Sequence, residues 1–267
     1  MAGSIARLIG QFFIALLLGC GTLALCQEQP AVSLTVRHRE GLVHGFLLLR
    51  TPEGETIATG ESSQVARGDR VTGNIVFHFK DGSLHEETVV FSQRYRLKIL
   101  SYHLTQKGPA FKRPMELSVN GVNGDVTARY TDDDGKEKEA SNRFNLPPDV
   151  ANGMIPTLLK NMQPGMTQLA ASMVAATPKP RLVKLLITPA GQDSFSIGTS
   201  KREATKYVVK VKVGGVAGVV APLVGKQPSD IYIWILGGDA PTFVKSEGPL
   251  YEGGPIWRIE LVSPTWP

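Results

Sequence analysis

The stretch 71–106 constrains the fold more than any other part of the chain. Its first arm, 71–80, alternates apolar and polar side chains, and a period of two residues is typical of a strand with one buried face. Asp81-Gly82 then supplies the turn of an antiparallel hairpin, and two further arms follow. The apolar parity changes near Ile99-Leu100, which predicts a β-bulge that bends the sheet.

Further alternating runs extend this antiparallel pattern along the chain. We predict strands at 32–36, 45–49, 55–60, 115–119, 126–130, 136–142, 182–187, 207–213, 231–235 and 257–261. One helical pattern, capped by Asp149 and containing Pro156, occupies 150–162, whereas 167–176 fits either a helix or a strand. The sequence therefore predicts a mainly β fold, a curved antiparallel meander that forms a half-barrel or open barrel wrapped around one helix.

The N-terminal segment has the pattern of an export signal. Arg7 precedes the apolar run 12–18, which is shorter than the roughly 20 residues needed to span a bilayer. Ala24 and Cys26 lie at positions −3 and −1 for a cleavage before Gln27. We therefore expect a signal peptide over 1–26 and a single β-rich domain over 27–267, with a helical insertion near 149–163. This predicts a periplasmic or secreted protein.

A second interpretation of the same segment stays open. Leu17-Leu18-Gly19-Cys20 resembles a bacterial lipobox, in which Cys20 would become the lipidated first residue. The protein would then be lipid-anchored through Cys20. In the alternative with cleavage before Gln27, no cysteine remains in the chain, so its folded domain would be held by its core and not by disulfides.

Composition excludes some classes of function. The chain has 42% hydrophobic and 20% charged residues, enough apolar material for a core. Without Arg7, its 29 basic residues become 28 against 24 acidic ones, a net charge of +4. The basic residues Lys206, Lys210 and Lys212 alternate along one predicted strand, as on a solvated face. We expect no nucleic-acid partner, although such a stripe favours peripheral association with anionic surfaces of the envelope.

Familiar catalytic and cofactor motifs are missing from the sequence. Gly225-Lys226 lacks the Ser or Thr of a phosphate-binding loop, because Gln227 follows it. The acidic run 132–135 fails as a calcium loop, because Tyr130 occupies the first ligand position. Neither G-x-S-x-G nor H-E-x-x-H occurs. We predict no catalytic residue, no cofactor and no resident metal.

The histidines of the hairpin are a weaker candidate for a metal site. If Asp81-Gly82 is a two-residue turn, His78 and His85 face one another across the hairpin, and His103 on the next arm adds a third ligand. A three-residue loop would shift the register and place the two histidines on opposite faces. Histidines exposed on a hairpin surface are the commoner interpretation.

Aromatic residues gather in the C-terminal third and form the candidate ligand-binding set. They are Tyr232, Trp234, Phe243, Tyr251 and Trp257, and Leu158 of the predicted helix joins them as part of a plug or lid. Aromatic residues at the mouth of a barrel suit an apolar ligand. The alternative is ordinary core packing and barrel closure.

Three phrases of the sequence together carry a resemblance to known proteins. They are Asp81-Gly82-Ser83-Leu84 before Glu86-Glu87-Thr88, Leu146-Pro147-Pro148-Asp149 before Asn152-Gly153, and Pro228-Ser229-Asp230 before Trp234. The chain resembles secreted bacterial β-rich proteins and, more loosely, periplasmic domains whose fold is similar to the lipoprotein-carrier half-barrel. The resemblance implies a curved sheet around a helix with a hydrophobic cavity. It implies no catalytic residues.

These observations lead to one function hypothesis and two competitors. The leading hypothesis is a non-enzymatic cell-envelope protein that binds a lipid or other apolar ligand in a β-sheet cavity. An envelope enzyme with acid–base residues drawn from unrelated strands is the first competitor, and a buried Asp, Glu or His cluster in a cleft would favour it. A structural or interaction module is the second. The oligomeric state stays open.

Overall fold

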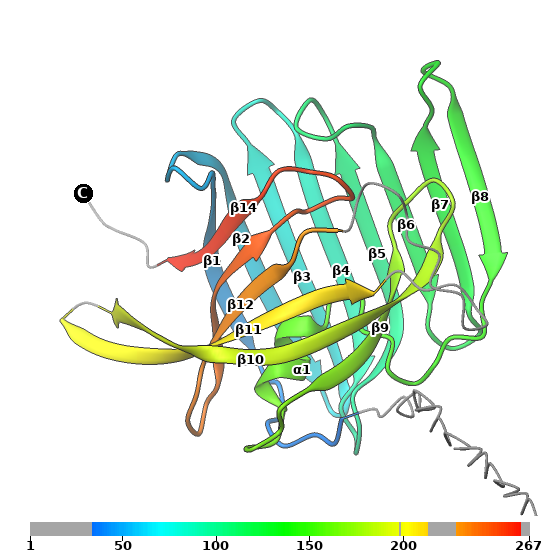
Figure 1. The fold of residues 1–267 in the computed structure, drawn as a ribbon. Coiled ribbons are helices and arrows are strands. Elements are labelled where there is room, and N and C mark those ends of the chain that lie inside the picture. Colours follow the sequence, from blue (N-terminus) through cyan, green and yellow to red (C-terminus); the bar gives the residue numbers. More distant parts are fainter. Residues whose placement is uncertain (1–33, 198, 213–227, 263–267) are drawn as a thin grey trace, which may run out of the picture. The chain divides into compact units, whose positions relative to one another are not determined.

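The computed structural model describes residues 34–197, 199–212 and 228–262 (Figure 1). Three segments named by the sequence predictions lie outside these residues. They are the predicted signal peptide 1–26 with Cys20, the start of the first predicted strand at 32–33, and Gly225-Lys226. The predictions made on those segments therefore remain predictions. No helix in the described part of the chain is both long enough and apolar enough to cross a bilayer.

In the part of the chain that the structure describes, fourteen antiparallel strands form one open sheet, which confirms the mainly β fold. The strands are β1 (Val43–Arg50), β2 (Thr56–Arg67), β3 (Arg70–Phe79), β4 (Leu84–Ser92), β5 (Lys98–Lys107), β6 (Met115–Asn120), β7 (Asp125–Thr131), β8 (Glu137–Arg143), β9 (Leu169–Ala175), β10 (Arg181–Ile197), β11 (Ser200–Lys212), β12 (Ile231–Leu236), β13 (Thr242–Gly248) and β14 (Trp257–Val262). The strand order in the sheet consists of two meanders, one running from β8 to β1 and the other from β14 to β9 (Figure 1). The meanders are joined edge to edge.

The two meanders join where β1 pairs with β14, far apart in sequence. Leu47 lies opposite Leu261 and Leu49 lies opposite Ile259. The outermost strands, β8 and β9, do not pair with one another, so the sheet stays open. Charged and polar side chains fill β8, and all but one of its residues are exposed, which discourages pairing with another chain at that edge.

The hairpin of β3 and β4 has the predicted strands and the longer of the two alternative loops. The N–H of Phe79 donates to the carbonyl of Ser83, and Gly82 adopts a φ of 85° in a three-residue loop, 80–82. The shifted register places His85 opposite Phe77 and His78 opposite Leu84, so the two histidines do not face one another. Of the two alternatives, the structure has the three-residue loop, in which Gly82 takes the left-handed position.

The predicted β-bulge is confirmed. On β5, Ser101 pairs with Val90 of β4 whereas Ile99 pairs with Phe91, so Leu100 is the extra residue on its strand. This insertion explains why Leu97 and Ile99 on one side of the bulge, and Tyr102 on the other, are all buried despite the change of parity.

The helix is shorter than its apolar pattern predicts. It is α1 (Ile155–Lys160), with Pro156 in its first turn and no side-chain cap. The preceding residues instead run along the edge of β9, where Ser172 donates its N–H to the carbonyl of Asp149 and accepts from the N–H of Ala151. The ambiguous stretch 167–176 therefore contains a strand, β9, and not a helix.

Two apolar clusters form the core. The larger one gathers Leu158, Leu159 and Met154 around α1 together with side chains from most of the sheet. The smaller one centres on Phe77, Phe79, Phe111 and Trp257, with aromatic ring centroids 5.4–6.4 Å apart among the last three. Burial of α1 residues in the larger cluster explains why the helix stays on the sheet.

Candidate ligand-binding cavity

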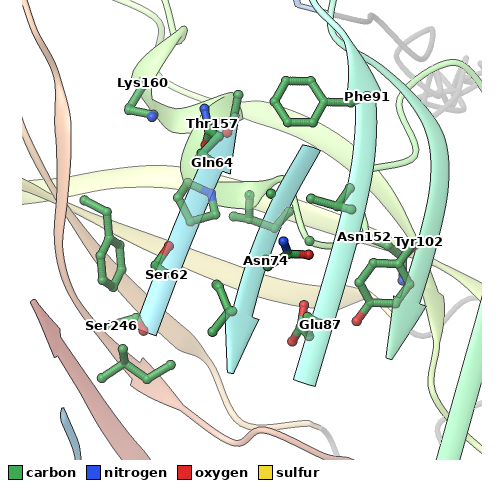
Figure 2. A pocket seen from close by; sticks show the side chains of 18 of the residues that line it. Ser62, Gln64, Asn74, Glu87, Phe91, Tyr102, Asn152, Thr157, Lys160 and Ser246 are labelled. Carbon is green, nitrogen blue, oxygen red and sulfur yellow. The ribbon is translucent and has the colours of Figure 1, made fainter. Parts of the chain in front are cut away.

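A cavity of about 1020 Å³ lies between the inner face of the sheet and α1 (Figure 2). Its walls are mainly apolar and come from strands of both meanders. They include Leu47, Ile75, Val89, Phe91, Val183 and Phe243. Ile155 and Pro156 of α1 also contribute to the lining. The cavity volume lies at the upper end of the roughly 300–1,000 Å³ that is typical of small-molecule sites.

Small residues on the inner face keep this space open. Gly45 on β1 pairs with Ser62 on β2, and Gly73 on β3 pairs with Val89 on β4. A Cβ atom at Gly73 would approach nothing closer than Val89 Cγ1 at 3.4 Å, an ordinary van der Waals distance. A larger side chain at Gly73 would therefore extend into the cavity without displacing backbone.

One carboxyl group interrupts the apolar wall. Glu87 of β4 lies on the same face as Val89 and Phe91, and its side chain is 24% exposed. Its Oε1 lies 3.0 Å from Nε2 of His85, a residue only 1% exposed. Tyr102 on β5 lies beside it (Figure 2) and also lines the cavity. Three polar groups thus meet at one point of the cavity wall.

Gln106 fixes how the protons of this network are arranged. Its Nε2 donates to the carbonyl of Leu250 at 2.8 Å and lies 3.0 Å from Nδ1 of His85. An amide NH₂ group only donates, so Nδ1 of His85 is the acceptor and the ring proton lies on Nε2. His85 therefore donates to Glu87.

The network favours the ionised form of Glu87. Burial opposes ionisation, but the hydrogen bond that His85 donates outweighs it and lowers the pKa of Glu87. For Tyr102, burial first and then the charge of Glu87 beside it raise the pKa of the phenol well above its ordinary value. At neutral pH the pair is a carboxylate and a neutral hydroxyl group.

The segment 37–40 closes the cavity near the C-terminal end of α1. Oδ1 of Asn161 accepts from the backbone N–H of Arg37 at 2.7 Å and of His38 at 2.8 Å. Lys160 of α1 forms an ion pair with Glu40, and both side chains are largely buried. These contacts tie the segment to the helix, so that the two elements form one wall.

Apolar side chains are exposed at the rim of the cavity. Leu42 is 83% exposed, Val43 is 48% exposed and Leu261 is 41% exposed, and all three contribute to the lining. They lie near the junction of β1 and β14. An apolar molecule can therefore reach the interior along an apolar surface.

The predicted ligand-binding residues separate into two groups in the structure. Phe243 and Tyr251 line the cavity. Leu158 and Trp257 are buried in the core clusters, and neither they nor Tyr232 and Trp234 belong to the lining. The role of Phe243 and Tyr251 in binding stays a prediction, whereas the other four have no contact with this cavity.

Trp234 shows most clearly why a predicted binding residue can be buried and yet lie outside the cavity lining. Its neighbours Ile233 and Ile235 point into the core, so Trp234 lies on the other face of β12. There its Nε1 donates to Oδ2 of Asp193 at 2.7 Å, and Nζ of Lys245 lies 3.9 Å from the ring centroid. The side chain is buried by strand neighbours on the outer face and not by the cavity.

The histidine candidates do not assemble into a metal site. His78 and His85 lie on opposite faces of the sheet, and His103 is hydrogen-bonded through Nδ1 to Oγ of Ser118 at 2.9 Å. Among the described residues, no group of three or more His, Cys, Asp or Glu side chains is placed to hold a metal ion.

Glu87 and Tyr102 were missed by sequence reasoning, although a signal for Glu87 was present. Along β4, Glu87 shares its parity with the apolar Val89 and Phe91, so it is a charged residue on the buried face of a strand. Such a residue is a candidate for a function. Its contact with Tyr102 required the β4–β5 register, in which Val89 lies opposite Tyr102.

Comparison with known proteins finds one remote structural match and no match in sequence. No protein-family model and no curated protein matches the sequence. One solved structure, from Bacteroides fragilis, has a YmcC-like fold, and its name assigns it provisionally to the exported proteins. It is 10% identical in sequence with a TM-score of 0.33, over 86% of this chain and 98% of that chain. Similarity at this level supports no inference about function.

Proposed function

We propose that this chain is a non-enzymatic protein of the cell envelope that binds a lipid, or another small molecule with an apolar body, inside the curved sheet. The observation that carries the proposal is the cavity of about 1020 Å³ with mainly apolar walls. Apolar surface that a ligand buries there contributes roughly 25 cal/mol per Å². The exposed apolar rim supports the same function, because it provides an entry for such a ligand.

The polar network in the cavity raises the competing hypothesis of an enzyme. A Glu–His pair in a cleft is an arrangement that acid–base catalysis uses. Here, however, both ring nitrogens of His85 are occupied, by Glu87 and Gln106, and the side chain is 1% exposed. The lowered pKa of Glu87 makes it a weak base, and the raised pKa of Tyr102 makes it a weak acid. These properties favour a binding role for the network.

Export is part of the proposal and rests on the sequence. The apolar run 12–18 and the small residues after it support cleavage before Gln27, with lipidation of Cys20 as the alternative. N-terminal sequencing and mass determination of protein from an envelope extract distinguish these two outcomes.

A hydrocarbon fluorophore tests whether the cavity binds apolar molecules. We expect 1,6-diphenyl-1,3,5-hexatriene to bind the delipidated protein saturably, with fluorescence that rises as the probe leaves water. Gly73→Leu should weaken binding at least tenfold, because the new side chain fills the cavity. Gly237→Leu is the matched control, since Gly237 is exposed with no atom within 4 Å of a Cβ there.

Two results would count against the binding function. The wild-type protein could show no saturable binding of the hydrocarbon. Alternatively, Gly73→Leu could bind it as tightly as Gly237→Leu, with both variants retaining the wild-type circular dichroism and melting temperature. The second result would place the fluorophore outside this cavity.

A further inference from the structure

We propose that the cavity selects molecules whose polar end is a hydrogen-bond donor, an alcohol or an amine on an apolar body, with that donor bound to the Glu87 carboxylate. The inference rests on the proposed binding function and specifies the chemistry of its ligand. It also excludes a carboxylate or phosphate as the group that lies against Glu87.

The direction of the hydrogen bonds around Glu87 determines which group of a ligand can bind there. Gln106 donates to His85, and His85 donates to Glu87 over 3.0 Å. Tyr102 lies beside the same carboxyl group, and a phenol that keeps its proton can only donate to a carboxylate. Along the chain from Gln106 through His85, the donated protons therefore point toward Glu87. The network consequently ends in an acceptor, so a ligand must supply a donor to satisfy it.

Glu87 has unused capacity on its cavity side. A carboxylate accepts up to about four hydrogen bonds, and His85 supplies one of them. Its side chain is 24% exposed, and Glu87 belongs to the lining of the cavity. The cross-strand neighbours of Glu87 are the apolar residues Ile75 and Leu104. A donor on the ligand is therefore the partner that completes this group.

The Glu87 carboxylate lies among side chains that are held rigidly. This favours selection of a matching ligand over adjustment of the protein to a different one. Gly153, with a φ of 67°, lies against Tyr102, since a Cβ there would be 3.2 Å from two ring carbons and 3.0 Å from Cβ of Val89. His85 is enclosed between Phe77 and Phe111, with ring centroids 6.1 and 6.3 Å away. Neither donor can therefore turn away to present a different group to the ligand.

A ligand with an acidic end has no matching site at this point. Its carboxylate would lie beside the Glu87 carboxylate in surroundings of low polarity, where like charges repel strongly. The ammonium group of Lys160 also borders the cavity, but Glu40 already neutralises it in a buried ion pair. The charge at Glu87 therefore favours an alcohol or an amine over an acid at this point of the lining.

Three ligands with the same chain and different ends test the inference. Dodecanol, dodecylamine and dodecanoic acid are titrated, below their aggregation concentrations and at pH 7.5, against the full-length secreted chain loaded with the hydrocarbon fluorophore. We expect the alcohol and the amine to displace it at concentrations at least tenfold lower than the acid does. Comparison of dodecanol with dodecylamine distinguishes a neutral hydrogen-bond donor from a cationic one.

Substitution of Glu87 tests whether this residue causes the preference for an alcohol or an amine over an acid. In Glu87→Gln the amine-to-acid ratio should fall at least tenfold because the charge is gone, while dodecanol stays within about threefold because the amide oxygen still accepts. Tyr102→Phe, which keeps the carboxylate, should retain the wild-type order. If Glu87→Gln does not fold, the order of the displacing concentrations of the three ligands on the wild-type protein still tests the inference.

The outcomes separate this inference from the binding function itself. If the hydrocarbon binds but the acid displaces it as well as the alcohol and the amine, the selection is wrong and the cavity function stands. An unchanged ratio in a folded Glu87→Gln protein would equally overturn the inference. If the hydrocarbon does not bind at all, both proposals fail.

Discussion

The side-chain amide of Asn152 forms two hydrogen bonds with the backbone of Val174. Nδ2 donates to the carbonyl oxygen and Oδ1 accepts from the N–H group, each over 2.9 Å. Val174 lies in β9, the last strand of the sheet. Asn152 therefore takes the place of a peptide group in a neighbouring strand, and it satisfies backbone groups at an edge that would otherwise lack partners.

Asn152→Ala should destabilise the protein by about 1–3 kcal/mol, because the variant leaves a buried donor and a buried acceptor of Val174 unsatisfied. Asn152 is 3% exposed, so water does not readily replace it. Urea denaturation followed by circular dichroism measures the loss. Asn142→Ala on the exposed edge strand β8 is the control and should change stability by less than about 0.5 kcal/mol. Equal effects of the two substitutions would contradict the role given to Asn152.

Leu158→Ala should cost about 2–5 kcal/mol, the range typical of a large-to-small change in a packed core. Leu158 is 7% exposed and belongs to the cluster that holds α1 against the sheet. Thermal and urea unfolding measure the change, with Val122→Ala, at a residue 74% exposed, as the control. A loss below about 0.5 kcal/mol at Leu158 would mean that the helix is peripheral to the core.

The ionised Glu87 should contribute to stability in a pH-dependent way. Its pKa in the native protein is lowered, whereas a Glu in an unfolded chain titrates near about 4.3. The contribution is therefore fully present above the unfolded value and is lost as the pH falls through the native pKa. We expect the free energy of unfolding of wild type minus that of Glu87→Gln to be larger at pH 6 than at pH 3.

Urea titrations of both proteins at the two pH values test this expectation. The comparison by difference matters because other carboxyl groups with lowered pKa values, such as those of Asp125 and Asp132, titrate in the same way in both proteins. A difference that stays constant between pH 6 and pH 3 would show that the native pKa of Glu87 is not lowered.

Trp234→Ala should destabilise the fold and leave binding of the hydrocarbon fluorophore unchanged. The cost is about 3–5 kcal/mol for a large aromatic residue that is 4% exposed. Trp234→Phe keeps most of the packing and loses only the hydrogen bond to Asp193, about 1 kcal/mol. Affinity measured on the folded fraction should stay within twofold of wild type. A tenfold weaker affinity would return Trp234 to the binding site.

The sequence alone determined which residues share a face of each strand. The alternation over 71–80 placed Phe77 and Phe79 together, and the parity change near Leu100 located the bulge, because both are consequences of local backbone geometry. The same alternation separated Trp234 from Ile233 and Ile235, although it did not say which of the two faces carries the cavity.

Only the tertiary structure decided the register and the site. The choice between a two- and a three-residue loop reverses which side chains meet across the hairpin, and it depends on Gly82. Glu87 and Tyr102 meet through strand pairing. The cavity requires the pairing of β1 with β14, which brings distant parts of the chain together. A period of two residues is local, whereas an enclosed volume depends on contacts between residues far apart in sequence.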